Sequence, residues 1–178
     1  MADNSDLKAL VRTIPDYPKA GIQFRDITTL LNDADGFALV VERMAEQCPP
    51  GIEAIAAIEA RGFLFGGALA PRLGAGLVPL RKQGKLPGAT IGVDYALEYG
   101  SDRLEMHEDA VLDRARVLLV DDLIATGGTA LAAIELLRMK GAEVAAASFV
   151  IDLPDLGGAA AVRETGVETH SLIAFEGD

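Results

Sequence analysis

The sequence predicts an α/β fold with a central, mostly parallel sheet flanked by helices. Short apolar runs rich in branched residues alternate along the chain with amphipathic segments of helical period. Charged residues or glycines follow most of these runs, where a strand would leave the sheet. The chain of 178 residues, half of them hydrophobic, has the length and the apolar content of a single domain. We therefore expect one domain over residues 1–178, with right-handed crossovers between parallel strands.

The elements are expected in the following order. Helices are predicted at about residues 5–11, 33–47, 62–73, 130–140 and 156–165, and strands at about 22–26, 52–58, 77–80, 117–120, 143–151 and 167–175. Asp33 or Asp35 is suited to begin the second helix, and Gly141 stands where the fourth should stop. The alternation at 22–26 also fits a mere half-buried edge strand.

Residues 90–109 differ from their surroundings, being polar and bearing tyrosines. They predict a long β-hairpin arm with few anchors to the core, which is either a mobile lid or an interface arm. Three glutamates in or beside it, Glu98, Glu105 and Glu108, would ordinarily be solvated charges.

The composition excludes several classes of partner. A net charge of −11 and a pI near 4.6 argue against nucleic acid and against an anionic membrane. The single cysteine, Cys48, cannot form an internal disulfide, and two histidines give no zinc pattern, as in proteins of the reducing cytoplasm. The polar start is unlike a signal peptide, and no apolar run is long enough to span a bilayer.

Residues 117–130, VLLVDDLIATGGTA, are the stretch most indicative of function. An apolar strand ends in two carboxylates, Asp121 and Asp122, and small residues then lead into a helix. Glycines let the backbone fold tightly around an anion, and the free N–H groups at the start of a helix point toward it. We interpret this as a site for a group with hydroxyls at one end and a phosphate at the other, a ribose 5-phosphate.

Two other interpretations of this stretch fit parts of the pattern. An apolar strand ending in acidic residues also occurs in P-loop NTPases, but the partner motif G-x-x-x-x-G-K-[ST] is absent, because Leu86 follows Gly84-Lys85. The sequence TGGT taken alone could be a flexible turn. Strand, acid pair and turn in one register favour the phosphate site.

Two further strands end in cations. The strand at 52–58 runs into Glu59-Ala60-Arg61-Gly62, where Arg61 could meet a phosphate or form a surface pair with Glu59. The strand at 77–80 runs into residues 81–85, RKQGK, which suit a polyanion such as diphosphate or form a solvated basic turn.

Five segments of the chain together resemble the adenine phosphoribosyltransferases, a family of the type I phosphoribosyltransferases. They occur in that family's order and spacing and span most of the chain: IPDYPKAGIQFRDIT (14–28), EARGFLFG (59–66), RKQGKLPG (81–88), YALEYGSDRLEMHEDA (95–110) and VDDLIATGGTA (120–130). The last is the superfamily's motif for 5-phosphoribosyl 1-diphosphate (PRPP), whereas FRDIT and LEYGSDRLEMH are specific to the family.

The resemblance implies the type I phosphoribosyltransferase fold, with an N-terminal hood at about 1–35 and a flexible hairpin arm at about 86–108. It implies that adenine and PRPP give AMP and diphosphate, in a homodimer. Mg²⁺ would be held mainly by substrate and water, without a protein metal cage.

The resemblance also assigns site residues. Asp121 and Asp122 would face the ribose hydroxyls and residues 125–129 the 5-phosphate. Glu98, carried by the closing arm, would approach N7 of adenine and, with Arg61, act in catalysis. The other substrate-binding residues would be Phe24, Arg25 and Leu123 at the base, Glu59, Ala60, Arg81, Lys82 and Lys85 at the diphosphate, Tyr99 on the arm, and Ala125, Thr126, Gly127, Gly128 and Thr129 at the phosphate.

Three rivals and one backbone feature follow from the same resemblance. A 6-oxopurine transferase typically carries an aspartate at the position of Ala125, and an orotate transferase lacks the FRDIT and LEYG segments. A PRPP-sensing regulator of the same fold usually adds a DNA-binding domain. The superfamily commonly has a non-proline cis peptide in its diphosphate loop, which we expect near Ala60-Arg61.

Overall fold

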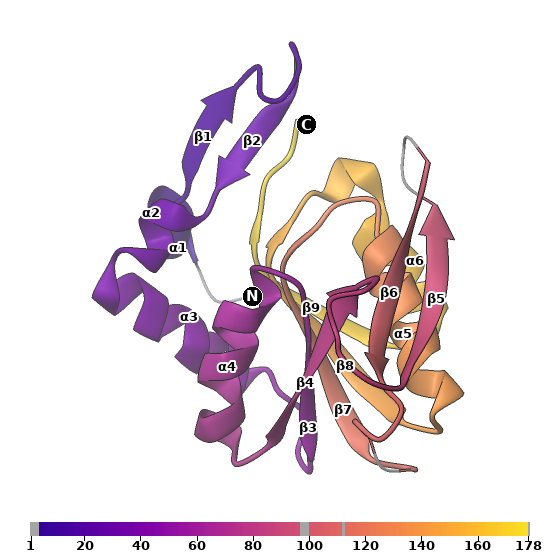
Figure 1. The fold of residues 1–178 in the computed structure, drawn as a ribbon. Coiled ribbons are helices and arrows are strands. Elements are labelled where there is room, and N and C mark those ends of the chain that lie inside the picture. Colours follow the sequence, from indigo (N-terminus) through magenta and orange to yellow (C-terminus); the bar gives the residue numbers. More distant parts are fainter. Residues whose placement is uncertain (1–3, 97–99, 112, 178) are drawn as a thin grey trace.

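The computed structural model describes residues 4–96, 100–111 and 113–177 and contains a seven-stranded sheet flanked by helices (Figure 1). The strand order is β5-β6-β4-β3-β7-β8-β9, in which β4, β3, β7, β8 and β9 run parallel and the β5–β6 hairpin pairs antiparallel at the β4 edge. The strands are β3 (Ala54–Ile58), β4 (Gly76–Lys82), β5 (Thr90–Ala96), β6 (Ser101–His107), β7 (Arg116–Ile124), β8 (Glu143–Asp152) and β9 (Glu168–Ala174). The predicted α/β architecture with a mostly parallel sheet is confirmed.

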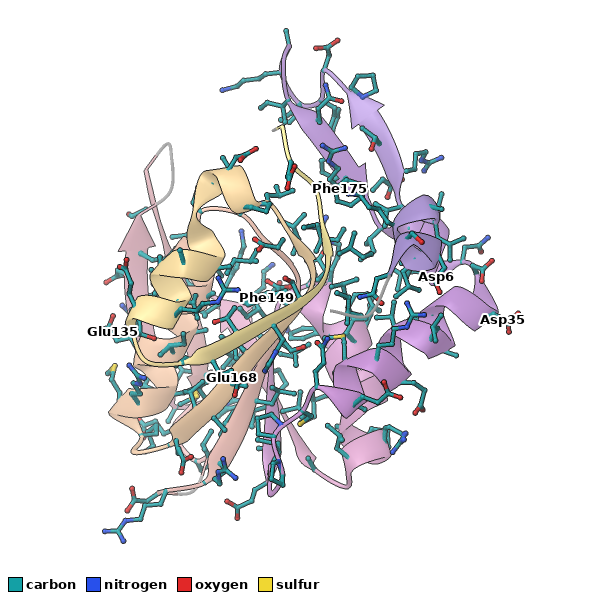
Figure 2. All side chains as sticks on the ribbon, turned by 180° about the vertical axis from the view of Figure 1, so that it is seen from behind. Asp6, Asp35, Glu135, Phe149, Glu168 and Phe175 are labelled. Atoms are coloured by element: carbon teal, nitrogen blue, oxygen red, sulfur yellow. The ribbon has the colours of Figure 1, made fainter. Side chains whose placement is uncertain are left out.

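Helices cover both faces of this sheet (Figures 1 and 2). They are α1 (Ser5–Ala9), α2 (Thr28–Leu31), α3 (Ala34–Glu46), α4 (Gly62–Leu73), α5 (Gly128–Met139) and α6 (Gly158–Glu164), with a 3₁₀ turn η1 (Pro154–Leu156). Alternate residues of β7 enter two separate cores: Val117 and Leu119 pack with α5 and α6, whereas Leu118 and Val120 pack with α1, α3 and α4. The apolar run of β7 is therefore explained by burial on both faces.

The helix boundaries agree closely with the sequence patterns. Helix α4 spans the predicted residues, and Asp33 caps α3 by accepting a hydrogen bond from the Gly36 N–H at 2.8 Å. Gly141 follows α5 with a positive φ of 78°, as expected for a helix stop. The sequence patterns missed α2, a single turn too short to show a period.

Strand β7 is longer than predicted. It continues through both aspartates to Ile124, because β8 keeps pairing beside it, with Asp121 opposite Phe149 and Leu123 opposite Ile151. The two carboxylates therefore lie within the last part of the strand, whose backbone fixes them.

The β5–β6 hairpin has more anchors than the sequence suggested. Val93, Leu104 and Met106 are buried in the core beside α5, and β6 pairs with the end of β4. Glu105 is also buried, with 8% of its surface exposed, contrary to the expected solvated charge. The pleat turns alternate residues of the hairpin toward the core. The mean polarity of the segment therefore did not show that one side of it is buried.

The N-terminal hood contains a two-stranded antiparallel sheet apart from the main one (Figure 1). Strand β1 (Arg12–Pro15), which the patterns missed, pairs with β2 (Gln23–Asp26), and the Tyr17–Pro18 peptide between them is cis. Asp26 holds the hood together: its carboxylate pairs with Arg12 and accepts hydrogen bonds from the N–H and hydroxyl of Thr28 at 3.0 and 2.7 Å. Within the described residues, no helix is long and apolar enough to cross a membrane.

Two adjacent glycines of α4 yield a matched prediction. A Cβ on Gly66 would lie 2.6 Å from the Cβ of Ala57 on β3, whereas one on Gly67 would meet nothing within 4 Å. We expect Gly66→Ala to lower the free energy of unfolding by about 1–3 kcal/mol through overpacking. Gly67→Ala should raise it by about 0.5–1 kcal/mol, since alanine favours helix. Urea unfolding checks both, and equal effects would contradict the close packing of α4 on β3.

Candidate active site

The predicted functional segments meet at one edge of the sheet. Strand β3 pairs in parallel with β4 and with β7, so the carboxyl ends of all three point the same way. Residues 59–62, 81–85 and 121–129 follow or complete these strands. This is the edge at which open α/β sheets bind ligands.

The turn from β7 into α5 has the form of an anion site. Gly127 caps α5 in the left-handed conformation with φ of 84°, and the first N–H groups of an α-helix have no partners within it. A hollow of about 120 Å³ lies over this turn and is lined by Asp121, residues 123–130 and Phe149. Such a turn suits a phosphate group.

The phosphate turn is supported from behind by the start of α6. The N–H of Gly158 donates to the carbonyl of Ala125 at 3.0 Å. A Cβ on Gly158 would lie only 2.3 Å from that oxygen and 2.6 Å from the nitrogen of Gly127. The absence of a side chain at Gly158 therefore lets α6 fix the backbone of the turn.

The two aspartates of β7 differ in environment. Asp122 is buried and forms an ion pair with Arg61, whose Nε lies 2.5 Å from Oδ2. Burial, and then the neighbouring charge of Asp122, raise the pKa of Asp121 well above its usual value. Gly62 permits this arrangement, since its Cβ would lie 3.0 Å from Oδ1 of Asp121.

The loop after β3 contains the expected non-proline cis peptide, at Glu59–Ala60, one bond before the predicted position. Glu59 accepts hydrogen bonds from Nε of Arg81 at 3.1 Å and from the N–H of Lys82 at 3.0 Å. Burial favours a raised pKa of Glu59, but these donors outweigh it and hold the pKa below its ordinary value. Glu59 thus orients the basic loop.

The basic loop folds back on itself. Arg81 donates from Nη1 to the carbonyl of Lys85 at 3.1 Å, and Lys82 pairs with Asp102 of β6 at 3.0 Å. Arg61, Arg81 and Lys82 therefore each have a carboxylate partner.

Residues expected at the base lie in the hood and at the end of β7. The ring of Phe24 packs edge-on against Tyr17 with centroids 5.2 Å apart, and the guanidinium of Arg25 lies 4.5 Å from the ring centre of Phe175. Leu123 is half-buried beside the phosphate turn. Glu98 and Tyr99 lie outside the described residues, so their roles stay predictions.

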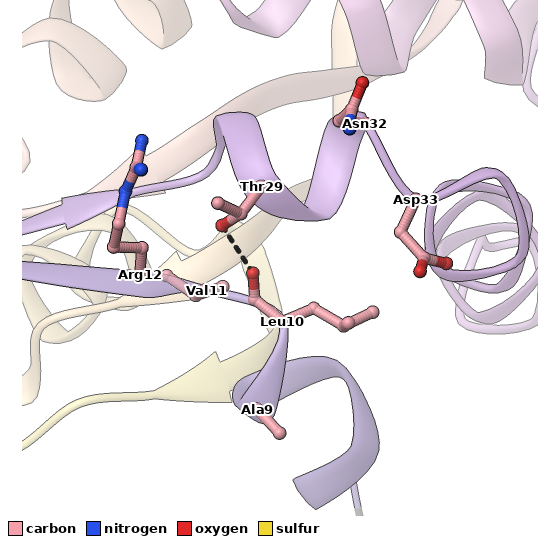
Figure 3. A pocket seen from close by; sticks show the side chains of 7 residues that line it. All are labelled: Ala9, Leu10, Val11, Arg12, Thr29, Asn32 and Asp33. Atoms are coloured by element: carbon pink, nitrogen blue, oxygen red, sulfur yellow. Dashed lines mark hydrogen bonds between the residues drawn. The ribbon is translucent and has the colours of Figure 1, made fainter.

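A larger hollow, of about 340 Å³, lies between α1, β1 and α2 and is lined by Ala9, Leu10, Val11, Arg12, Thr29, Asn32 and Asp33 (Figure 3). Three of its polar side chains already have partners. Thr29 donates to the carbonyl of Leu10 at 2.6 Å, Arg12 pairs with Asp26, and Asp33 caps α3. We assign no ligand to this hollow.

The sequence is similar to those of known proteins. The model of the phosphoribosyl transferase domain family matches residues 28–164. Adenine phosphoribosyltransferase of Sphingopyxis alaskensis is 63% identical over 97% of this chain and 95% of that protein, and that of Erythrobacter litoralis is 60% identical over 97% of each. This chain belongs to the adenine phosphoribosyltransferase family.

Solved structures of other adenine phosphoribosyltransferases have the same fold. The enzyme of Thermoanaerobacter pseudethanolicus is 47% identical, with a TM-score of 0.91 over 97% of this chain and 99% of that one. The enzyme of Saccharomyces cerevisiae, solved with adenine and an imino-altritol bisphosphate, is 36% identical, with a TM-score of 0.89 over 96% and 98%. The fold predicted from the family resemblance is thereby confirmed.

Two residues of the β5–β6 hairpin hold the basic loop, a role that the sequence patterns did not predict for them. Glu105 accepts the N–H of Gly84 at 3.0 Å and so holds the basic loop, and Asp102 holds Lys82. The sequence pattern that could have indicated them is the alternation along β6, which places residues 102, 104 and 106 on one side of the strand and residues 103 and 105 on the other. A single sequence does not reveal which partner each side meets.

The hood gives a prediction that depends on pH. Hydrogen bonds from Arg12 and Thr28 lower the pKa of Asp26 from 3.8 to about 2. Because the folded pKa is depressed, this stabilisation is complete above pH 4 and is lost as the pH falls from about 4 to about 2. Asp26→Asn should cost about 1–2 kcal/mol at pH 7, since Arg12 is largely exposed, and should flatten the decline below pH 4.

Urea unfolding at pH 7, 4 and 3 measures this effect. Asp109→Asn is the matched control, because that carboxylate is exposed in a turn. A pH profile of Asp26→Asn parallel to that of the unchanged protein would contradict the assignment.

Proposed function

We propose that the protein catalyses the reaction for which its family is named, joining adenine to PRPP to give AMP and diphosphate in purine salvage. The observation that carries this proposal is the single edge of the sheet at which a phosphate turn, an acid pair and a cluster of cations meet. Membership of the family supports adenine as the base, and the residues at this edge of the sheet support binding of the sugar and its phosphates.

The proposed binding mode of PRPP follows the order of the chain. The 5-phosphate would lie on the N–H groups of residues 125–129, where the small side chains leave the backbone accessible. The ribose hydroxyls would donate to the carboxylates of Asp121 and Asp122. A charge-assisted bond of this kind contributes about 1.5–3 kcal/mol.

The diphosphate would lie between the loops after β3 and β4. Arg61, Arg81, Lys82 and Lys85 supply positive charge there, in a protein whose net charge is −11. As diphosphate leaves C1 of the ribose, negative charge builds on its oxygens, and cations already in place stabilise it without reorganising. We expect this to be the largest catalytic contribution, with Arg61 acting on the departing group.

Mg²⁺ suits this arrangement as a substrate-bound ion. Among the described residues no cluster of three or more histidines, cysteines, aspartates or glutamates is placed to hold a metal. Asp121, Asp122 and Glu59 could accept hydrogen bonds from its water ligands, a mode that Mg²⁺ prefers. The ion would neutralise charge on the diphosphate when bound.

The base would lie between the hood and the end of β7. We propose that backbone groups around Phe24 and Arg25 bind the adenine edge while Leu123 packs on its face. Although Val93, Leu104 and Met106 anchor the arm at 86–108 to the core, we propose that its end around Glu98 closes over the site and brings that carboxylate to N7, with Tyr99 beside it. Glu98→Gln should lower kcat with little change in the KM for adenine, and an unchanged kcat would contradict a proton transfer role.

The proposed cellular setting is a cytoplasmic homodimer, in which residues near Lys85 could reach the partner's site. The runner-up activities are transfer to a 6-oxopurine and PRPP sensing without catalysis. Ala125, where a 6-oxopurine transferase typically has an aspartate, disfavours the first.

The choice of base tests the proposed function directly. Purified protein with PRPP and Mg²⁺ should convert radiolabelled adenine to AMP and leave hypoxanthine and guanine almost untouched. Equal turnover of hypoxanthine would contradict the assignment of adenine. PRPP binding without turnover of any base would favour the sensing regulator.

The acid pair gives a second test. Asp121→Asn and Asp122→Asn should each raise the KM for PRPP, with about 1.5–3 kcal/mol lost where the carboxylate is charged. The raised pKa of Asp121 predicts the smaller loss there. Glu143→Gln is the control, because its exposed pair with Arg116 lies at the opposite end of β7. An unchanged KM in both aspartate variants would rule out their contact with ribose.

A further inference from the structure

Two of the three ion pairs described at the proposed diphosphate site join residues of the site's own segments. Arg61 pairs with Asp122 and Arg81 with Glu59, and both carboxylates come from the loops and strands of the site itself. Lys82 differs, because its partner Asp102 belongs to the β5–β6 hairpin. The proposed reaction gives Asp102 no role.

Asp102 is held by three donors. Its Oδ2 lies 3.0 Å from Nζ of Lys82 and accepts the hydroxyl of Tyr95 at 3.3 Å, while its Oδ1 accepts the N–H of Arg103 at 2.8 Å. All three favour the ionised carboxylate, and Lys82 contributes most to lowering its pKa. Asp102 is therefore a fixed negative charge at neutral pH.

The hairpin carries this charge to the mouth of the site. Strand β5 packs along α5, which begins at the phosphate turn. The hydroxyl of Tyr95, on β5, donates to Asp102 at 3.3 Å. Tyr95 thus connects the strand that packs on α5 to the carboxylate that holds Lys82.

Lys82 is free to change partners. Its side chain is 55% exposed, against 21% for Asp102. An exposed ion pair is weak and the lysine stem is flexible, whereas diphosphate offers several negative charges to one ammonium group. A fixed carboxylate beside that ammonium both occupies it and repels an arriving anion.

We propose that Asp102 is a positioning residue that competes with diphosphate for Lys82. In the free enzyme it holds the ammonium group at the edge of the site, and bound diphosphate draws Lys82 away from it. When the ion pair between Asp102 and Lys82 forms again, diphosphate loses its contact with the ammonium group, and its release is faster. This proposal rests on the proposed function, since it assumes that diphosphate binds beside Lys82.

The test is calorimetric titration of inorganic diphosphate, with Mg²⁺ at constant ionic strength, into the full-length protein. Asp102→Asn keeps the shape and loses the charge, so it should bind diphosphate about 3–10-fold more tightly. The matched control is Asp94→Asn on the same hairpin, whose partner Arg103 lies 3.0 Å away and whose side chain is 72% exposed. This control should bind as the unchanged protein does.

A double-mutant cycle separates the proposed competition from a general charge effect. In a Lys82→Gln background, Asp102→Asn should give no gain in affinity, because the contested ammonium is gone. Equal or weaker binding by Asp102→Asn, a gain that persists without Lys82, or an equal gain in Asp94→Asn would each overturn the proposal. Should Asp102→Asn not fold, Asp102→Ser carries the same expectation.

The unchanged protein separates this proposal from the one beneath it. If it makes no AMP and binds no diphosphate, the proposed function fails and Asp102 has nothing to compete with. If it does both and the variants do not differ, only the role of Asp102 fails.

Discussion

The parallel pairing of β3 with β4 and β7 is the constraint on which the site depends. It brings three chain segments that are far apart in sequence to one edge, each at the point where its strand ends. Small residues make the approach close enough: Gly62 sets the start of α4 against Asp121, and Gly158 sets α6 against the phosphate turn. The positions of the charges follow from this backbone packing more than from the charges themselves.

A protein with a net charge of −11 that binds polyanions needs a positive electrostatic potential at the binding site, although its overall charge is negative. It gathers cations at one edge of the sheet and pairs them with carboxylates that come from different segments of the chain. Glu59 and Asp122 belong to the edge and orient it, whereas Asp102 reaches it from the hairpin. Pairing keeps these cations in place, since unpaired like charges would repel one another.

The sequence predicted most of the fold because its apolar runs are long and well separated. The end of β7 was misplaced since charge was taken as the end of a strand, although β8 continues to pair with it. The hairpin was judged weakly anchored because alternation averages to polarity over a window. Long-range contacts were beyond reach: nothing local ties Glu105 to Gly84, or Asp102 to Lys82. The turn of small residues between β7 and α5 was predictable because it depends on consecutive residues.

The first and last elements of the described chain are joined. Asn4 donates to the carbonyl of Leu172 at 2.7 Å, Lys8 donates to that of Ala174 at 2.5 Å, and Arg25 covers the ring of Phe175. During synthesis on the ribosome the hood emerges first, and β9 emerges after the other strands of the sheet. The hood therefore cannot pack against β9 until the rest of the sheet has been synthesised. The contacts of Asn4, Lys8 and Arg25 with residues 172–175 therefore form only after β9 has been synthesised.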